Sequence, residues 1–229
     1  MTDYQRETRD AYKSGERARS YKHYNTTAWS WGRIATAREQ RGLQRVMARE
    51  RWAASDMILD MPCGTGILAG VLNTLPARVV AGDISHEMMA LGRDEYRADA
   101  FVGAVQGDLT RTPFRPGTFA AVCILGFLHR VPTAIKRAAL TEAAILSSRL
   151  VVVTCAIDTP LQRIKHRVLR AVRRRHIPAP APTTLASLIA DCEAAGLRVR
   201  EQFWVLPVLS AEIVLVLEKI PGSHAHSRT

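Results

Sequence analysis

The sequence of 229 residues predicts an α/β protein built on one doubly wound, mostly parallel sheet. From residue 57 onward, short apolar runs alternate with stretches of helical periodicity, which is typical of strand–helix–strand units. A glycine-rich turn follows the first apolar run, and only a few residues join the last two runs. We therefore expect seven strands, closed by an antiparallel hairpin and preceded by a helical extension.

Seven segments have the length and apolar content of buried strands. The expected strands are Met57–Met61, Arg78–Gly82, Phe101–Val105, Phe119–Leu125, Leu150–Ala156, Glu201–Leu206 and Glu212–Glu218. The expected helices are Ile34–Trp52, Gly66–Asn73, Ser85–Arg97, Thr133–Ser147 and Thr184–Ala195. The connection at 207–211 is too short for a crossover, so the last two strands should be antiparallel.

The chain divides into an extension, one large domain and a tail. Residues 1–55 are charged and aromatic without a strand pattern, and we expect a helical extension there that can act as a lid. The domain is expected at 56–220, with a basic helical insertion at 160–182, and residues 221–229 are expected to be a disordered tail. The polar start and the absence of an apolar run of about 20 residues predict a cytoplasmic protein.

Charge and cysteine content narrow the function without choosing one. The formal net charge of +11 favours an anionic partner such as nucleic acid or an anionic membrane, although arginine-rich surfaces are often only solvated. The four cysteines form no Cys-x-x-Cys pair, which argues against a zinc site and a disulfide scaffold. We expect reduced, mostly buried thiols and no metal site.

The end of the first expected strand feeds a glycine turn and a helix, which predicts a ligand site. Open α/β sheets bind ligands beyond the carboxyl ends of their strands, and glycine lets a ligand lie against the main chain. The spacing Gly64-x-Gly66-x-x-Ala69, with Asp83 further on, also fits a dinucleotide fingerprint, so a dehydrogenase is an alternative. The carboxylate of Asp60 favours a cationic ligand over a pyrophosphate.

Four motifs in order resemble those of class I S-adenosylmethionine-dependent methyltransferases. LDMPCGTG resembles the first motif, GDISHEMM the second-strand motif, and GDLTRTPFRPGTFAAV the third and fourth. The resemblance is clear over residues 57–149, looser to residue 219, and of the general type of quinone-biosynthesis methyltransferases. It implies a Rossmann-like fold and S-adenosyl-L-methionine as cofactor. Pro62 departs from the pattern, where a glycine is usual, and stiffens the turn.

The resemblance also implies which residues bind the cofactor. They are Asp60, Pro62, Gly64, Thr65, Gly66, Asp83, Ile84, Met88, Asp108, Leu109 and Leu125. The glycine loop and Asp60 would hold the methionine moiety. Asp83 would accept hydrogen bonds from the ribose hydroxyls and Asp108 from the adenine amino group, with Ile84, Met88 and Leu109 near the adenine. Alternatively, the two later aspartates only cap turns at the strand ends.

In the methyltransferases that the sequence resembles, the segment after the fourth strand lies beside the transferable methyl group. His129 in that segment is our candidate catalytic base, because an imidazole of near-neutral pKa can take a hydroxyl proton. Alternatively, it only bonds to backbone at a helix entry. No Asp/Asn-Pro-Pro-Tyr/Phe run follows this strand, which argues against methylation of adenine or cytosine amino groups. A nucleophilic cysteine for cytosine-C5 methylation would be expected in the loop after the fourth strand. Cys63 lies in the first glycine loop, so we expect it to be structural.

Two segments outside the common fold are expected to form walls of an acceptor pocket. One is the aromatic extension, which can alternatively be a helix packed on the sheet. The other is residues 161–176, where apolar residues at helical spacing alternate with basic ones and no acid; such a helix can lie on an anionic membrane, bind phosphates or face solvent. The candidate substrate residues are Tyr21, Tyr24, Trp29, Trp31, Arg33, Arg130, Arg163 and Arg167.

These features together predict in-line methyl transfer to a small or lipid-linked acceptor. An RNA methyltransferase is the alternative, favoured by the basic segment, although no separate RNA-binding module is recognisable. A further alternative is a non-catalytic basic adaptor that keeps the fold and binds a membrane or an acidic partner. The methylated atom and the oligomeric state stay open.

Overall fold

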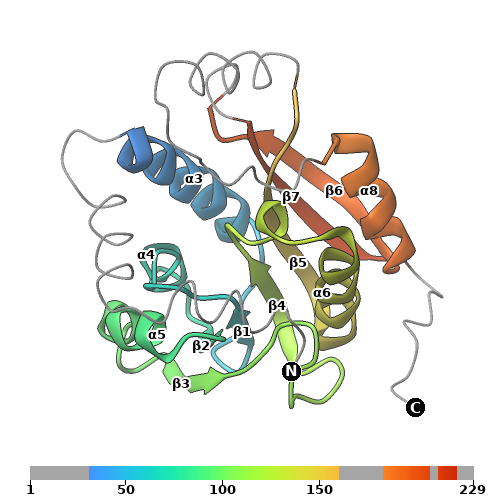
Figure 1. Cartoon of the computed structure of the whole chain (residues 1–229). Coiled ribbons are helices and arrows are strands. Elements are labelled where there is room, and N and C mark those ends of the chain that lie inside the picture. Colours follow the sequence, from blue (N-terminus) through green and yellow to red (C-terminus); the bar gives the residue numbers. More distant parts are fainter. Residues whose placement is uncertain (1–30, 160–182, 207–210, 221–229) are drawn as a thin grey trace.

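The computed structural model describes residues 31–159, 183–206 and 211–220. Seven strands form a single sheet in the order β3-β2-β1-β4-β5-β7-β6 (Figure 1). The strands are β1 (Met57–Asp60), β2 (Arg78–Asp83), β3 (Phe101–Gln106), β4 (Phe119–Ile124), β5 (Ser147–Ala156), β6 (Leu197–Trp204) and β7 (Glu212–Lys219). The helices are α3 (Trp31–Ala48), α4 (Ala69–Leu72), α5 (His86–Gly92), α6 (Thr133–Leu146) and α8 (Leu185–Ala194), with 3₁₀ turns η1 (Arg93–Glu95) and η2 (Leu128–Arg130).

Strand pairing confirms the predicted fold class. The pairs β3–β2, β2–β1, β1–β4 and β4–β5 are parallel, whereas β7 is antiparallel to both β5 and β6. The strand order reverses between β1 and β4, because the chain leaves one half of the sheet after β3 and starts the other with β4. An open α/β sheet binds its ligands at such a switch point, beyond the carboxyl ends of the strands.

Helices cover both faces of the sheet. On one face, α3, α4 and α5 pack on a core that includes Leu43, Val152 and Val214 (Figure 1). On the other face, α6 and α8 pack on a core that includes Leu140 of α6 and Val153 of β5 (Figure 1). Residues of β5 therefore alternate between two buried faces, which explains why this strand is an almost continuous apolar run.

Helix α3 belongs to this packed layer. Val46 and Met47 lie about one helical turn after Leu43, and all three are at most 2% exposed. A Cβ on Gly42 would lie 2.2 Å from the ring of Phe203, so the glycine lets α3 approach β6. For residues 31–48, the alternative of a helix packed on the sheet describes the structure.

Several predicted boundaries were wrong. The expected helix Gly66–Asn73 is mainly turns with one helical turn at Ala69–Leu72, because Gly66 is held at φ +77°. The expected strand Glu201–Leu206 begins earlier, at Leu197. Its first residues alternate between a buried and an outward-facing side chain, a period of two that the sequence-based reading missed.

The ends of two other helices also differ from expectation. The expected helix Ser85–Arg97 divides into α5 and η1. The expected helix Ile34–Trp52 instead spans Trp31–Ala48, and the indole N–H of Trp52 donates to the Met47 carbonyl (2.7 Å) just beyond its end.

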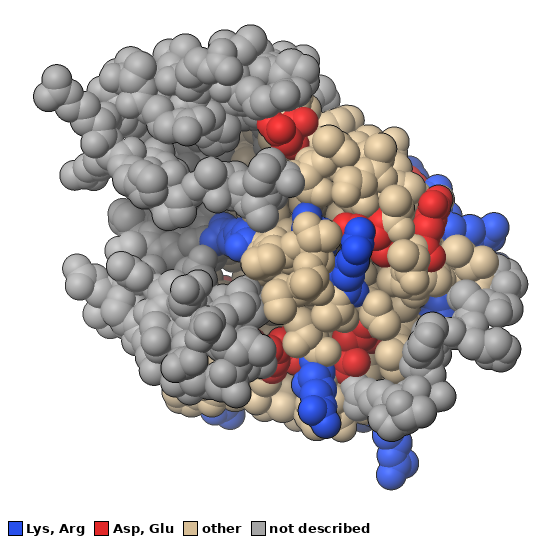
Figure 2. Space-filling model, turned by 45° about the vertical axis from the view of Figure 1, so that its right-hand side comes forward, with Lys and Arg blue, Asp and Glu red and all other residues tan. Residues whose placement is uncertain are grey.

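The cysteines and the surface bear on the compositional predictions. All four cysteines are free and buried, as predicted. On the face drawn in Figure 2, the acidic and basic side chains of the described residues are interspersed rather than gathered into one basic patch. Within the described ranges, no helix has both the length and the apolar character needed to span a bilayer.

Candidate functional site

The glycine loop after β1 is fixed by backbone contacts with β2 and α5. The Cys63 N–H donates to the Gly82 carbonyl (2.7 Å), and the Gly66 N–H donates to the Cys63 carbonyl (3.0 Å). Gly64 and Gly66 have φ of +53° and +77°, in the left-handed region that favours glycine. A Cβ on Gly66 would lie 2.7 Å from the Gly92 carbonyl oxygen, so the loop can pack against α5 only with glycine here.

Asp83, the last residue of β2, ties this loop to the start of α5. Its Oδ2 accepts from the Gly64 N–H and its Oδ1 from the Ser85 N–H, both at 2.9 Å. Ser85 in turn caps α5, since its hydroxyl accepts from the Met88 N–H (3.2 Å). The turn-capping alternative for Asp83 is therefore present in the structure. A carboxylate has about four lone-pair positions, so further hydrogen bonds to a ligand fit beside the two backbone bonds.

Asp60 lies deeper in the same site and is paired with a tyrosine. It is 1% exposed, and the Tyr96 hydroxyl donates to its Oδ2 (2.6 Å). Burial raises the pKa of Asp60 to about 7, the hydrogen bond from Tyr96 opposes the shift, and the charge of Asp83 adds to it. Asp60 is consequently half-ionised near neutral pH, and a positive charge placed beside it would favour the carboxylate.

Tyr96 was not anticipated from the sequence. It follows η1, is buried, and stacks on Phe101 with ring centroids 5.2 Å apart. Burial, followed by the charge of Asp60, raises the pKa of its hydroxyl well above the usual range, so Tyr96 stays a hydrogen-bond donor. The sequence did carry a signal for Tyr96, which is an aromatic residue with a polar hydroxyl group near the end of an expected helix.

The remaining loop residues line the same region. Thr65 is 2% exposed, and its hydroxyl oxygen has no hydrogen-bond partner in the described structure. A buried hydroxyl of this kind ordinarily finds a partner, which a bound ligand can supply. Met88 approaches Gly64, with its Cε 3.6 Å from a Cβ built there. Pro62 is half-buried after a cis peptide bond, and its expected effect on the cofactor stays a prediction.

The residues expected near the adenine occupy the loop after β3 and the start of α5. Asp108 Oδ1 accepts from the N–H and the hydroxyl of Thr110, both at 2.8 Å, so the turn-capping alternative is present here too. Leu109 is 4% exposed and packs in the core cluster on the α6 face. Ile84 is half-buried, and its carbonyl accepts from the Gln106 side chain (3.1 Å). Their contact with an adenine stays a prediction.

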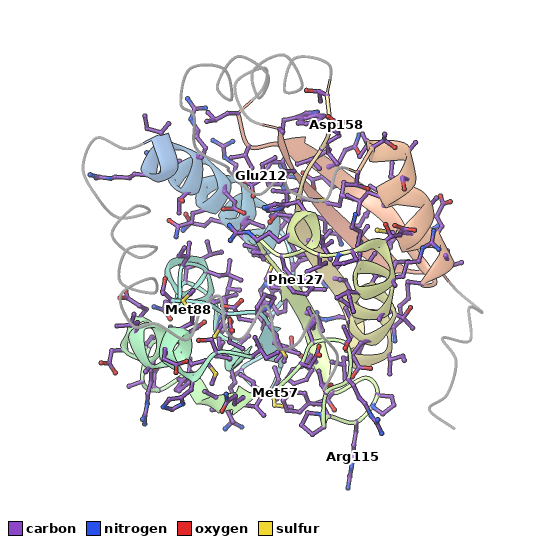
Figure 3. The ribbon with its side chains drawn as sticks, viewed as in Figure 1. Met57, Met88, Arg115, Phe127, Asp158 and Glu212 are labelled. Atoms are coloured by element: carbon purple, nitrogen blue, oxygen red, sulfur yellow. The ribbon has the colours of Figure 1, made fainter. Side chains whose placement is uncertain are left out.

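The segment that follows β4 is anchored by a threonine of β5. Gly126 has φ +65°, and its N–H donates to the Thr154 hydroxyl oxygen (2.8 Å). Around it, Leu125 packs towards the α3 face and Phe127, labelled in Figure 3, towards the α6 face. The sharp turn directs the backbone into η2, which carries His129.

His129 differs from the expected near-neutral imidazole. Burial lowers its pKa to about 4, and the positive charges of Arg130 and Lys136 add to the shift. Its Nε2 accepts from the Arg130 Nε–H (3.4 Å), while its buried Nδ1 has no hydrogen-bond partner in the described structure. The neutral imidazole can therefore accept a hydrogen bond at physiological pH, but it holds a proton more weakly than the sequence led us to expect.

A family comparison matches the glycine loop and the strands around it. Residues 58–147 match the sequence model of a methyltransferase domain. Over these residues the chain is similar to methyltransferase domains. Its glycine loop, Asp83 and Asp108 all fall within the matched residues.

Among curated proteins, the chain is similar to demethylmenaquinone methyltransferases. The chain is 36% identical over 130 residues to the protein of that name from Mycolicibacterium vanbaalenii. The match covers 56% of this chain and 53% of the relative, so the chain spans about half the length of the curated relatives it matches.

Solved structures support the fold. Magnesium protoporphyrin IX methyltransferase from Synechocystis PCC 6803 has a TM-score of 0.73 and 17% identity, covering 93% of this chain and 98% of that chain. The [4+2]-cyclase SpnF has a TM-score of 0.60 and 14% identity, covering 79% of this chain and 80% of that one. A cyclase among the structural neighbours illustrates that the fold alone does not specify methyl transfer.

The candidate substrate residues are only partly described. Trp31 begins α3, Arg33 is exposed on the same helix, and Arg130 is exposed on η2 beside His129. The remaining candidates lie outside the described residues, as does the expected basic helix at 161–176; these candidates are Tyr21, Tyr24, Trp29, Arg163 and Arg167.

Proposed function

We propose that this chain is an S-adenosylmethionine-dependent methyltransferase that acts on a small or lipid-linked acceptor. The observation that carries the proposal is the glycine loop held at the switch point of the sheet. Asp83 fixes Gly64 there, and Gly66 packs directly on Gly92, so the loop presents its backbone in a preorganised form.

The residues of the loop fit S-adenosyl-L-methionine. The carboxylates of Asp60 and Asp83 suit a ligand with a sulfonium and an ammonium group, and would disfavour the pyrophosphate of a dinucleotide. The buried, unpartnered hydroxyl of Thr65 offers a further hydrogen bond to a ligand. When bound, the cofactor supplies an activated methyl group on a good leaving group, so the chain has mainly to align the acceptor and exclude water.

In this proposal, His129 serves the acceptor side. The segment from Leu125 to Arg130 follows the strand that adjoins β1, so it borders the methionine end of the cofactor site. In the tautomer with its proton on Nε2, which gives up the 3.4 Å hydrogen bond from Arg130, His129 can accept a hydrogen bond from an acceptor hydroxyl at Nδ1 and take its proton as the methyl group is transferred. Without the imidazole, the same turn could position the acceptor but could not take its proton.

The curated relatives support an acceptor of the demethylmenaquinone type, because several carry the name demethylmenaquinone methyltransferase. RNA is the second candidate acceptor, favoured by the arginines of segment 161–176. A non-catalytic adaptor is the third candidate function, favoured by Pro62 in the cofactor loop.

The proposal is tested by methyl transfer from labelled S-adenosylmethionine to reduced demethylmenaquinone and, separately, to total RNA. We expect label in the quinol, with a rate that changes little with salt. Label in RNA, with a rate that falls steeply as salt rises, would favour the RNA alternative. No transfer to either and no cofactor binding would favour the adaptor.

A further inference from the structure

Helix α3 carries an acid in its apolar stripe. Glu39 precedes Leu43 by about one helical turn, and Val46 and Met47 continue the same face into the core. The side chain of Glu39 is therefore directed at the sheet, where it is only partly accessible to solvent. A carboxyl group in this position requires polar partners on the sheet.

Those partners come from the ends of β5 and β7. Thr154 is fully buried and lies near Glu39, because its hydroxyl lowers the pKa of the Glu39 carboxyl. Glu212 begins β7 opposite Ala156, two residues beyond Thr154, and lies beside α3 in Figure 3. Burial, followed by the nearby Glu212 carboxylate, raises the pKa of Glu39 to about 8, which identifies the two acids as close neighbours.

The same hydroxyl group reaches the acceptor side of the methyltransferase domain. Thr154 Oγ1 accepts from the Gly126 N–H (2.8 Å), at the left-handed residue that starts the turn towards His129. A hydroxyl can donate one hydrogen bond and accept others, so Thr154 can bond to Glu39 and Gly126 at the same time. Thr154 thus lies between the buried acid of α3 and the backbone after β4.

We propose that Thr154 is a positioning residue that holds segment 126–130 in place for the methyl acceptor. Its hydroxyl oxygen accepts from the Gly126 N–H, and the nearby Glu39 carboxyl offers a polar partner for the hydroxyl proton. The proposal rests on the proposed function only in assigning the acceptor to this segment. The hydrogen-bonded arrangement itself can be tested without any acceptor.

The chain offers a matched control for a buried threonine hydroxyl. Thr112 is 3% exposed, and its hydroxyl donates to Glu142 (2.6 Å), on the opposite face of the sheet from α3. Thr112→Val removes a buried threonine–glutamate hydrogen bond, as Thr154→Val does, but leaves segment 126–130 untouched. Thr154→Ser keeps the hydroxyl and is the conservative variant, and Glu39→Leu removes the neighbouring carboxyl group without altering Thr154.

The experiment uses the full chain and compares wild type with these four variants. Hydrogen–deuterium exchange measures the backbone amides of residues 126–130, and calorimetry measures the affinity for S-adenosylhomocysteine. We expect Thr154→Val to speed exchange of these amides about fivefold, since one net hydrogen bond is lost. Its affinity for S-adenosylhomocysteine should stay within about twofold of wild type, because the cofactor loop is unchanged.

The kinetic readout is kcat with reduced demethylmenaquinone. Thr154→Val should lower kcat about tenfold, as misplacement of a reacting partner does, with Thr154→Ser close to wild type and Glu39→Leu in between. Unchanged exchange in both Thr154→Val and Glu39→Leu would overturn the proposal, as would an equal effect of Thr112→Val. If wild type methylates no acceptor, the proposed function fails, and the exchange data alone then decide whether Thr154 holds the segment.

Discussion

Asp83→Ala is the substitution that most directly separates a structural from a cofactor-binding role at the end of β2. Asp83 is 7% exposed, and its carboxylate receives the N–H groups of Gly64 and Ser85. The sequence alone suggests that alanine here would leave the fold intact. The structure instead predicts a loss of stability, because alanine leaves two backbone donors without their acceptor.

The magnitude follows from these two bonds. A hydrogen bond to a charged group contributes about 1.5–3 kcal/mol, and water entering the vacated space recovers part of it, so the net loss should be about 2–4 kcal/mol. Burial disfavours the charged form of Asp83 and raises its pKa, so we expect a loss near the lower end of this range. If the same carboxylate also binds the ribose, cofactor affinity should fall more than about tenfold, or about 1.4 kcal/mol.

Two assays separate the two effects. Urea unfolding gives the free energy of unfolding, and calorimetric titration with S-adenosylhomocysteine at low temperature gives the affinity of the folded variant. Asp99→Ala is the control, since Asp99 pairs with Arg97 on the surface and should change neither quantity by much. Wild-type affinity in Asp83→Ala would show that Asp83 does not bind the cofactor. Wild-type stability would refute the stabilising role of its hydrogen bonds from Gly64 and Ser85.

Three further predictions concern the loop, Asp60 and the candidate base. Gly66→Ala should lower the free energy of unfolding by about 2–4 kcal/mol in urea, from the left-handed backbone and the clash with Gly92; a loss below about 1 kcal/mol would contradict the close packing. The pKa of Asp60 rises on folding from 3.8 to about 7, so the folded protein binds the proton more tightly and this group's contribution to stability falls as pH rises through that window. If the ligand requires the carboxylate, cofactor affinity should be about tenfold weaker at pH 6 than at pH 8, and Asp60→Asn should remove that dependence. His129→Asn should lower kcat by about 10²-fold or more while changing affinity for S-adenosylhomocysteine little; unchanged kcat would reject His129 as the base.

The fold was largely predictable from the sequence, because it depends on patterns that single segments carry. The alternation of strands and helices, the glycine turn and the short link before β7 each have a local signature. The predicted ends of helices and strands were wrong where a tertiary contact overrides the local conformational preference of the sequence. The clearest case is the turn at Gly66, whose contact with Gly92 replaces the expected first turn of a helix.

The site was predictable in its residues but not in its electrostatics. Asp60 and Asp83 follow from motif positions, whereas the Tyr96 hydroxyl on Asp60 depends on how η1 returns to β1. The lowered pKa of His129 depends on burial and on the approach of Lys136, neither of which a single sequence reveals. The acid in the apolar stripe of α3 was a further visible signal that was passed over.

The central claim is tested most directly by calorimetric titration of the full chain with S-adenosylmethionine, S-adenosylhomocysteine and NADH. The account predicts that the first two bind with dissociation constants in the micromolar range and that NADH does not bind. Binding of NADH in place of both would contradict the assignment of the cofactor, and binding of none of the three would favour the adaptor.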